Sequence, residues 1–178
     1  MKTVIATAIV AWLLAAPALA QDPGEIQRLF EAGRFQQVVE ATNPDSPPDV
    51  LYTTAQSQQK MGATDQAMQT FTRLAERPEG DPWRFIGLSG RQLTEGNVEA
   101  AVASGRQAVA MAGDLPQAHF QLGLALARAQ QWNEAAAAFD AASERQPNNA
   151  YAHYYGGMMH YRANRVDRMA VDFEQFLK

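Results

Sequence analysis

Apolar residues recur at spacings of three and four along most of this chain. That spacing is typical of helices that bury one face. It is clear in residues 116–149, where Leu122 and Leu126 are followed by Phe139 and Ala142. No segment shows the strict alternation that predicts a β-strand, so the pattern predicts an all-α fold.

The helical pattern repeats at an interval of 34 residues. Pro48, Pro82 and Pro116 stand at this interval, and each suits the first turn of a helix, where its missing N–H is not needed. Gly62 and Gly96 recur at the same interval, where a helix is expected to end in a left-handed residue. Each unit is therefore predicted to be a helix, a tight turn and a second helix.

These units predict the organisation of the chain. We expect four stacked units at 48–81, 82–115, 116–149 and 150–178. Residues 21–47 carry a weaker version of the pattern, and we interpret them as a degenerate N-terminal capping half-repeat and linker. One helical pair buries too little apolar surface to be stable alone, so the units are expected to fold as a stack.

The third unit resembles the tetratricopeptide repeat family. The residues that carry the resemblance are Leu122, Gly123, Leu126, Trp132, Ala135, Phe139, Ala142 and Pro147. The resemblance implies a right-handed superhelical solenoid of antiparallel helix pairs. It also implies a concave, partner-binding groove lined by the first helix of each pair. Gly105 stands where the family usually has a large side chain, and Met169 and Phe176 stand where it usually has alanine.

The resemblance also indicates which residues line the groove. Aromatic residues and methionine gather toward its C-terminal end, which suits the binding of an apolar peptide or helix. The alternative is that these rings only pack between neighbouring helices or serve self-association. The predicted groove residues are Tyr52, Gln56, Lys60, Trp83, Ile86, Leu93, Phe120, Leu124, Arg128, Tyr151, Tyr154, Met158, Tyr161 and Arg162.

Composition and motifs argue against several classes of function. The 178 residues carry a formal net charge of −4 and contain no cysteine. An acidic chain without a basic cluster does not predict nucleic-acid binding. Lack of cysteine excludes disulfides and thiolate metal sites. We find neither a nucleophile elbow nor a glycine-rich phosphate loop, so we expect no enzymatic activity and no cofactor.

The three histidines raise the question of a metal site. His119 and His153 occupy the same position in successive units, and His160 lies seven residues further on. Seven residues of helix span about 10.5 Å, which is too far for two imidazoles to share one ion easily. We therefore expect buried histidines between helices and no metal site. Carboxylates such as Asp140 are expected on solvent-facing helix surfaces.

The first twenty residues have the pattern of a secretory signal peptide. Lys2 provides the positive charge, an apolar stretch follows, and Ala18 and Ala20 form a small-x-small cleavage site before Gln21. We expect removal of this segment and a periplasmic protein. The alternative is an uncleaved signal that anchors the protein in the membrane.

The expected function is a periplasmic interaction scaffold that holds a partner peptide or helix in the concave groove. One alternative is a self-associating structural module, and another is the recognition segment of a larger envelope assembly factor.

Overall fold

The computed structural model describes residues 22–178, so the predicted signal peptide at 1–20 lies outside the described residues. These residues form ten α-helices and no β-strand, which confirms the all-α prediction. The helices are α1 (Pro23–Glu31), α2 (Phe35–Glu40), α3 (Pro48–Lys60), α4 (Thr64–Ala75), α5 (Pro82–Thr94), α6 (Val98–Met111), α7 (Pro116–Arg128), α8 (Trp132–Arg145), α9 (Ala150–Arg162) and α10 (Val166–Phe176).

Local sequence signals explain where the helices begin and turn. Proline occupies the first turn of α3, α5 and α7, as the pattern predicts, and also that of α1. The turns inside the pairs each contain one residue with a left-handed backbone. Three of these residues are glycines, whereas the third and fourth predicted units use residues with a side chain. The turn residues are Gly33, Gly62, Gly96, Gln130 and Asn164.

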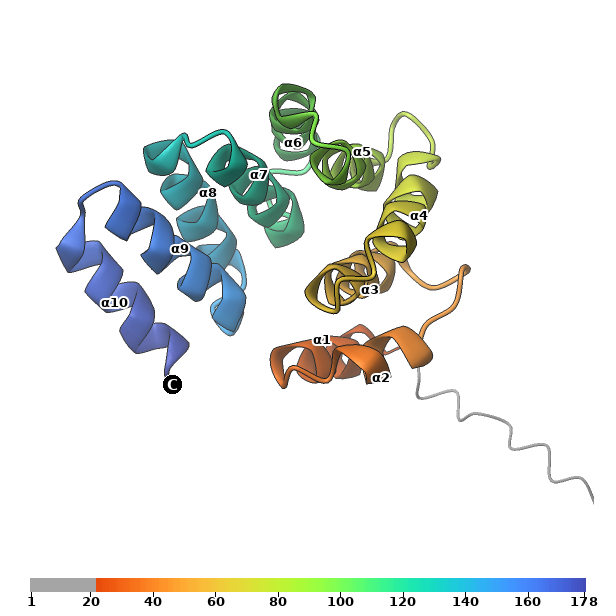
Figure 1. The fold of residues 1–178 in the computed structure, drawn as a ribbon, viewed down its shortest axis with the longest axis horizontal. Coiled ribbons are helices and arrows are strands. Elements are labelled where there is room, and N and C mark those ends of the chain that lie inside the picture. Colours follow the sequence, from red (N-terminus) through yellow and green to blue (C-terminus); the bar gives the residue numbers. More distant parts are fainter. Residues whose placement is uncertain (1–21) are drawn as a thin grey trace, which may run out of the picture.

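The helices pack in chain order and curve into an open ring in Figure 1. One continuous apolar core runs through the stack from Leu51 to Met159. Some contacts need a residue without a side chain. A Cβ atom added to Gly90 in α5 would lie 2.4 Å from the ring of Phe71 in α4. The helices can therefore approach this closely only because position 90 is glycine.

Gly105 shows how the stack accommodates a departure from the family pattern. A Cβ atom at this position would lie 3.1 Å from the backbone of Leu122 in α7. The side chain of Leu122 packs into the space that a large residue at position 105 would occupy. The change is therefore compensated by the following repeat.

The two ends of the stack differ. The pair α1–α2 forms a small apolar core of its own, built from Ile26, Phe30 and Val38 with Val50 of α3. By contrast, α10 has no fully buried residue. Among residues 22–178, no helix has the length and apolar character needed to cross a membrane.

Candidate functional site

The inner wall of the ring is bridged by the chain's own side chains. In Figure 1, α3, α5, α7 and α9 face the centre of the ring, and α4, α6 and α10 lie outside. The ring of Phe30 in α1 lies 4.8 Å from that of Tyr151 in α9. Lys60 of α3 donates a 2.9 Å hydrogen bond to the hydroxyl of Tyr155, and its ammonium lies 4.6 Å from the Tyr151 ring. The first and last repeats therefore touch, and the predicted continuous groove is divided.

A buried chain of hydrogen bonds fixes the first helices of the repeats relative to one another. The Tyr52 hydroxyl donates to Gln121 over 3.2 Å, and the Gln121 amide donates to the hydroxyl of Ser89 over 3.3 Å. Ser89 in turn donates to the carbonyl of Ala101 over 2.8 Å. Burial raises the pKa of Tyr52 well above its usual value. The phenol is thus a neutral donor that connects α3 to α7.

An apolar recess, which we call the arginine opening, lies beside the contact between Lys60 and Tyr155 that bridges the ring. It encloses about 540 Å³. Its apolar lining comes from Leu93, Leu124, Trp132, Tyr155, Met158 and Met159, and its cationic side chains are Arg128 and Arg162. The guanidinium of Arg162 lies 5.7 Å from the ring centre of Trp132, which favours a cation–π contact. Within the described residues, no carboxylate lines this recess.

A second recess of about 530 Å³ has a different chemistry. Its lining is mostly polar and carries both signs of charge, with Arg28, Glu31, Asp49 and Arg145 among its residues. A smaller cavity of about 220 Å³ beside Phe30 and Lys60 shares Leu124 and Tyr155 with the arginine opening. The arginine opening therefore combines apolar surface with uncompensated positive charge, whereas the second recess does not.

The structure divides the predicted groove residues into groups. Five of them line the arginine opening: Leu93, Leu124, Arg128, Met158 and Arg162. Two others, Lys60 and Tyr151, form the bridge across the ring. Trp83 is half-buried beside Tyr52, with ring centres 6.2 Å apart. Tyr161 is exposed and lines none of the three recesses.

Several predicted groove residues need correction. Four are largely buried: Tyr52, Gln56, Ile86 and Phe120. Gln56 and Phe120 still line the smaller cavity, whereas Tyr52 and Ile86 line none of the three recesses. Ile86 belongs entirely to the apolar core. Tyr154 packs on α10, with ring centres 5.3 Å from Phe176 and 6.3 Å from Phe173. The physical reason is the repeat itself: the fifth residue of a unit packs on the second helix of its own pair, as Tyr52 does on Phe71 and Phe120 on Phe139. Tyr155, one residue later, lines the recess instead.

Several lining residues were missed at the sequence level, and Tyr155 and Trp132 are the largest of them. Tyr155 occupies the sixth position of its repeat, which the family pattern includes among the inner positions. Trp132 was recognised only as part of the repeat motif. Trp132 begins α8 and lines the recess, where α9 places Arg162 beside it. That proximity depends on packing and has no signal in the local sequence.

The histidines have two structural roles. His119 and His153 place Nε2 at 2.9 Å and 3.0 Å from the carbonyls of Gly113 and Pro147, so each fixes the loop before its own helix. His160 is buried, and its Nε2 lies 3.1 Å from Asp140 Oδ1. The expectation that Asp140 faces solvent is wrong, because the contact with His160 draws its carboxylate into the α8–α9 interface.

The comparisons with known proteins agree with this architecture. Two segments, residues 49–79 and 116–149, match family models described as tetratricopeptide repeat. No curated protein sequence matches the chain.

Solved structures resemble the chain in fold. One is TTC0263, described as a thermophilic TPR protein in Thermus thermophilus. It is 19% identical with a TM-score of 0.64, over 89% of this chain and 90% of that one. A structure of MamA is 16% identical with a TM-score of 0.55, over 86% and 88% of the two chains. These likenesses support the predicted solenoid fold.

Proposed function

This chain belongs to the tetratricopeptide repeat family, and from that premise we propose that it is a protein–protein interaction scaffold rather than an enzyme. Its partner segment binds in the arginine opening. The observation that carries this proposal is the combination of an apolar lining with two exposed arginines in one recess. The bridge between α3 and α9 argues against a long peptide that follows the whole inner wall.

The chemistry of the recess defines the kind of segment that fits. An apolar side chain of the partner would contact Leu93, Leu124 and Met158. A neighbouring carboxylate would pair with Arg128 or Arg162, because arginine binds carboxylates through two parallel hydrogen bonds. The best-fitting partner is therefore a short peptide or helix end with an apolar residue next to an acidic one. The partner makes only a few buried contacts, and binding must also order a flexible peptide. We therefore expect a dissociation constant on the order of micromolar.

A displayed library of random peptides tests the proposal even though the natural partner is not identified. We expect the protein to enrich peptides that carry an apolar residue beside Asp or Glu. The double variant Arg128→Glu/Arg162→Glu should bind the enriched peptides at least about tenfold more weakly, because it replaces attraction by repulsion.

The matched control is the double variant Arg34→Glu/Arg73→Glu, which makes the same change of charge just before α2 and on α4. Both residues are exposed and neither lines the arginine opening. Equal loss of binding in the two double variants, or enrichment of basic peptides, would contradict the proposed site. Circular dichroism of both variants shows whether the helices remain intact.

We also propose that the scaffold works in the periplasm. The support is the sequence pattern of residues 1–20, with Lys2, an apolar stretch and the Ala18–Ala20 cleavage motif. Expression in a Gram-negative host should yield a periplasmic protein whose first residue is Gln21, as measured by mass spectrometry of the intact chain. Retention of residues 1–20 in the membrane fraction would favour the uncleaved anchor.

Self-association is a second candidate function, favoured by the outer surface of the last repeat. Val166, Val171 and Leu177 are all exposed there. Sedimentation of the protein distinguishes the candidates. A monomer at micromolar concentration supports the scaffold alone, and a dimer that Val171→Glu dissociates supports self-association through α10.

A further inference from the structure

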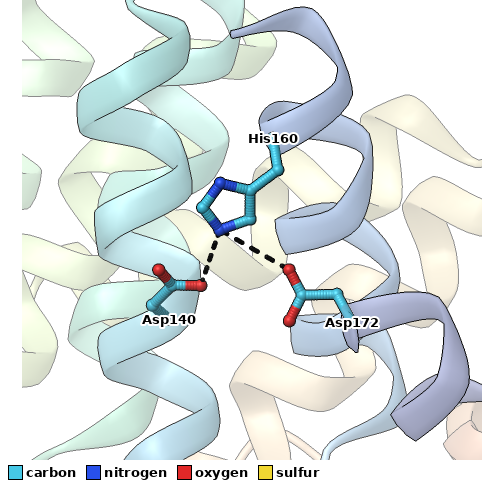
Figure 2. A group of neighbouring side chains, drawn as sticks. All are labelled: Asp140, His160 and Asp172. Atoms are coloured by element: carbon cyan, nitrogen blue, oxygen red, sulfur yellow. Dashed lines mark hydrogen bonds and ion pairs between the residues drawn. The ribbon is translucent and has the colours of Figure 1, made fainter. Parts of the chain in front are cut away.

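Three helices bring together a group of metal-ligand side chains away from the arginine opening. Asp140 comes from α8, His160 from α9 and Asp172 from α10, as Figure 2 shows. His160 Nε2 lies 3.1 Å from Asp140 Oδ1 and 3.5 Å from Asp172 Oδ2. One ligand atom from each residue lies within 4.8 Å of the other two. The group thus joins the third repeat to both helices of the fourth.

Hydrogen bonding inside the group does not satisfy its atoms. His160 Nε2 carries at most one proton, and the hydrogen bond that it makes is to Asp140. The Oδ2 atom of Asp172 is buried and has no hydrogen-bond partner. A buried oxygen without a partner is unfavourable. Burial, and then the nearby charge of Asp140, raise the pKa of Asp172, as expected for two carboxylates around one nitrogen.

We propose that Asp140, His160 and Asp172 bind a divalent transition-metal ion, for which Zn²⁺ is the best-fitting probe. Zinc bonds to imidazole nitrogen and carboxylate oxygen of about 2.0–2.2 Å place neighbouring tetrahedral ligand atoms about 3.3–3.6 Å apart. The separations of 3.1 Å and 3.5 Å from His160 Nε2 lie close to this range, and the two carboxylate oxygens, within 4.8 Å of each other, could reach it by side-chain movement. An imidazole in the set favours Zn²⁺ over Mg²⁺ and Ca²⁺, which prefer oxygen ligands alone. Three protein ligands leave the fourth position to water.

Neighbouring side chains approach the outer oxygen of each carboxylate. Arg168 Nη2 lies 3.4 Å from Asp140 Oδ2, and His153 Nδ1 lies 3.7 Å from Asp172 Oδ1. In each carboxylate, the contact is to the oxygen that would not coordinate the ion. Such outer contacts orient metal ligands in known sites. The ring of His153 is itself fixed by its contact with the carbonyl of Pro147.

Exposure of the three residues gives the ion a path to the site. The side chain of His160 is 1% exposed, whereas those of Asp140 and Asp172 are 23% and 13% exposed. An ion would therefore enter past the carboxylates and meet the imidazole at the base. Because α10 has no fully buried residue, a metal bridge from Asp172 to α8 and α9 would hold the last helix on the stack.

Zinc titration of the purified protein, without a polyhistidine tag and after treatment with a chelator, tests the proposal. Calorimetry should show one Zn²⁺ per chain. At a free Zn²⁺ concentration of 100 times Kd, the melting temperature should rise by about 5–10 °C. Loading with Co²⁺ should give the intense visible absorption of tetrahedral cobalt, which reports coordination independently of stability.

Matched variants separate this site from non-specific binding. His160→Gln and Asp172→Asn should each weaken Zn²⁺ binding at least about tenfold, because each removes one of three ligands. His119→Gln and Asp167→Asn should bind Zn²⁺ like the wild type, since His119 is bonded to a loop carbonyl and Asp167 is exposed. If His160→Gln does not fold, the Zn²⁺ affinity of Asp172→Asn alone tests the proposal.

Two results would overturn the proposal. One is the lack of a one-to-one Zn²⁺ complex of the wild-type protein. The other is an equal loss of binding in the Asp172→Asn and Asp167→Asn variants. In both cases His160 would be a hydrogen-bond donor to Asp140 and no more.

Discussion

At one end of the helical stack, α1 and α2 bury Ile26, Phe30 and Val38 in a small apolar core; at the other end, α10 buries none of its residues fully. The N-terminal pair is also held from across the ring, because Phe30 contacts Tyr151. The last helix is held by Phe173, which packs on Gly157 and Tyr154, and by the polar contacts of Asp172. A stack of repeats can thus end either with a small buried core of its own or with a helix whose residues all stay partly exposed.

The largest expected effect comes from breaking the apolar end. Phe30→Ala removes a ring that is 3% exposed and leaves a cavity against Tyr151, so the free energy of unfolding should fall by about 3–4 kcal/mol. Phe176→Ala on α10 is the matched control. That ring is 38% exposed and contacts Tyr154, and its removal should cost about 1–2 kcal/mol. Equal losses in urea unfolding would refute the difference between the ends.

Opening the ring should have the next largest effect. Tyr151→Ala removes the contact with Phe30 and the cation–π contact with Lys60, which should cost about 2 kcal/mol. Hydrogen exchange should become faster in α1 and α2 and stay unchanged in α7. Small-angle scattering should show a larger radius of gyration. An unchanged radius of gyration and unchanged hydrogen exchange in α1 would mean that the bridge does not hold α1 and α2 against α9.

The buried phenol that connects the repeats predicts a pH-dependent effect. Tyr52→Phe loses the hydrogen bond to Gln121 and should lower stability at pH 7 by about 1 kcal/mol. Because the pKa of Tyr52 is raised in the folded protein, its contribution is present below the unfolded value of 10.0 and is lost as pH rises above it.

The stability deficit of Tyr52→Phe should therefore shrink above pH 10. Urea unfolding of both proteins at pH 7 and at pH 11 measures this change. A deficit that stays constant between these pH values would contradict the buried, neutral phenol.

The smallest effect is expected on the outer surface of α10. Val171 is 52% exposed, so Val171→Ser should change stability by less than about 0.5 kcal/mol. The measurement should be repeated at two protein concentrations. A loss of more than about 1 kcal/mol that grows with concentration would show that a second copy covers this surface.

Repeat periodicity was sufficient to predict the helices. Pro48, Pro82 and Pro116 mark helix starts, and the turn positions have a left-handed backbone even where Gln130 and Asn164 replace glycine. These features depend on local preferences that a single sequence displays. The 34-residue interval also predicted a continuous core, because residues at equivalent positions meet when equal units stack.

Contacts between distant repeats could not be predicted in the same way. The bridge from Lys60 to Tyr155 depends on how far the ring curves, and small rotations between repeats accumulate along the stack. By contrast, the packing of Tyr154 on Phe173 of α10 stays within one helix pair and repeats that of Phe120 on Phe139. The approach of Asp140 and Asp172 to His160 involves three helices. The seven-residue spacing of His153 and His160 gave no indication of it.

Site-specific photo-crosslinking can show whether a partner segment binds in the arginine opening. A photoreactive phenylalanine analogue is placed at Gln59, an exposed residue that lines this opening, or at Gln107, an exposed residue of α6 that lines none of the three recesses. We expect an enriched peptide to be crosslinked from position 59 and not from position 107. Crosslinking from position 107, or equally from both positions, would mean that the peptide binds elsewhere on the protein.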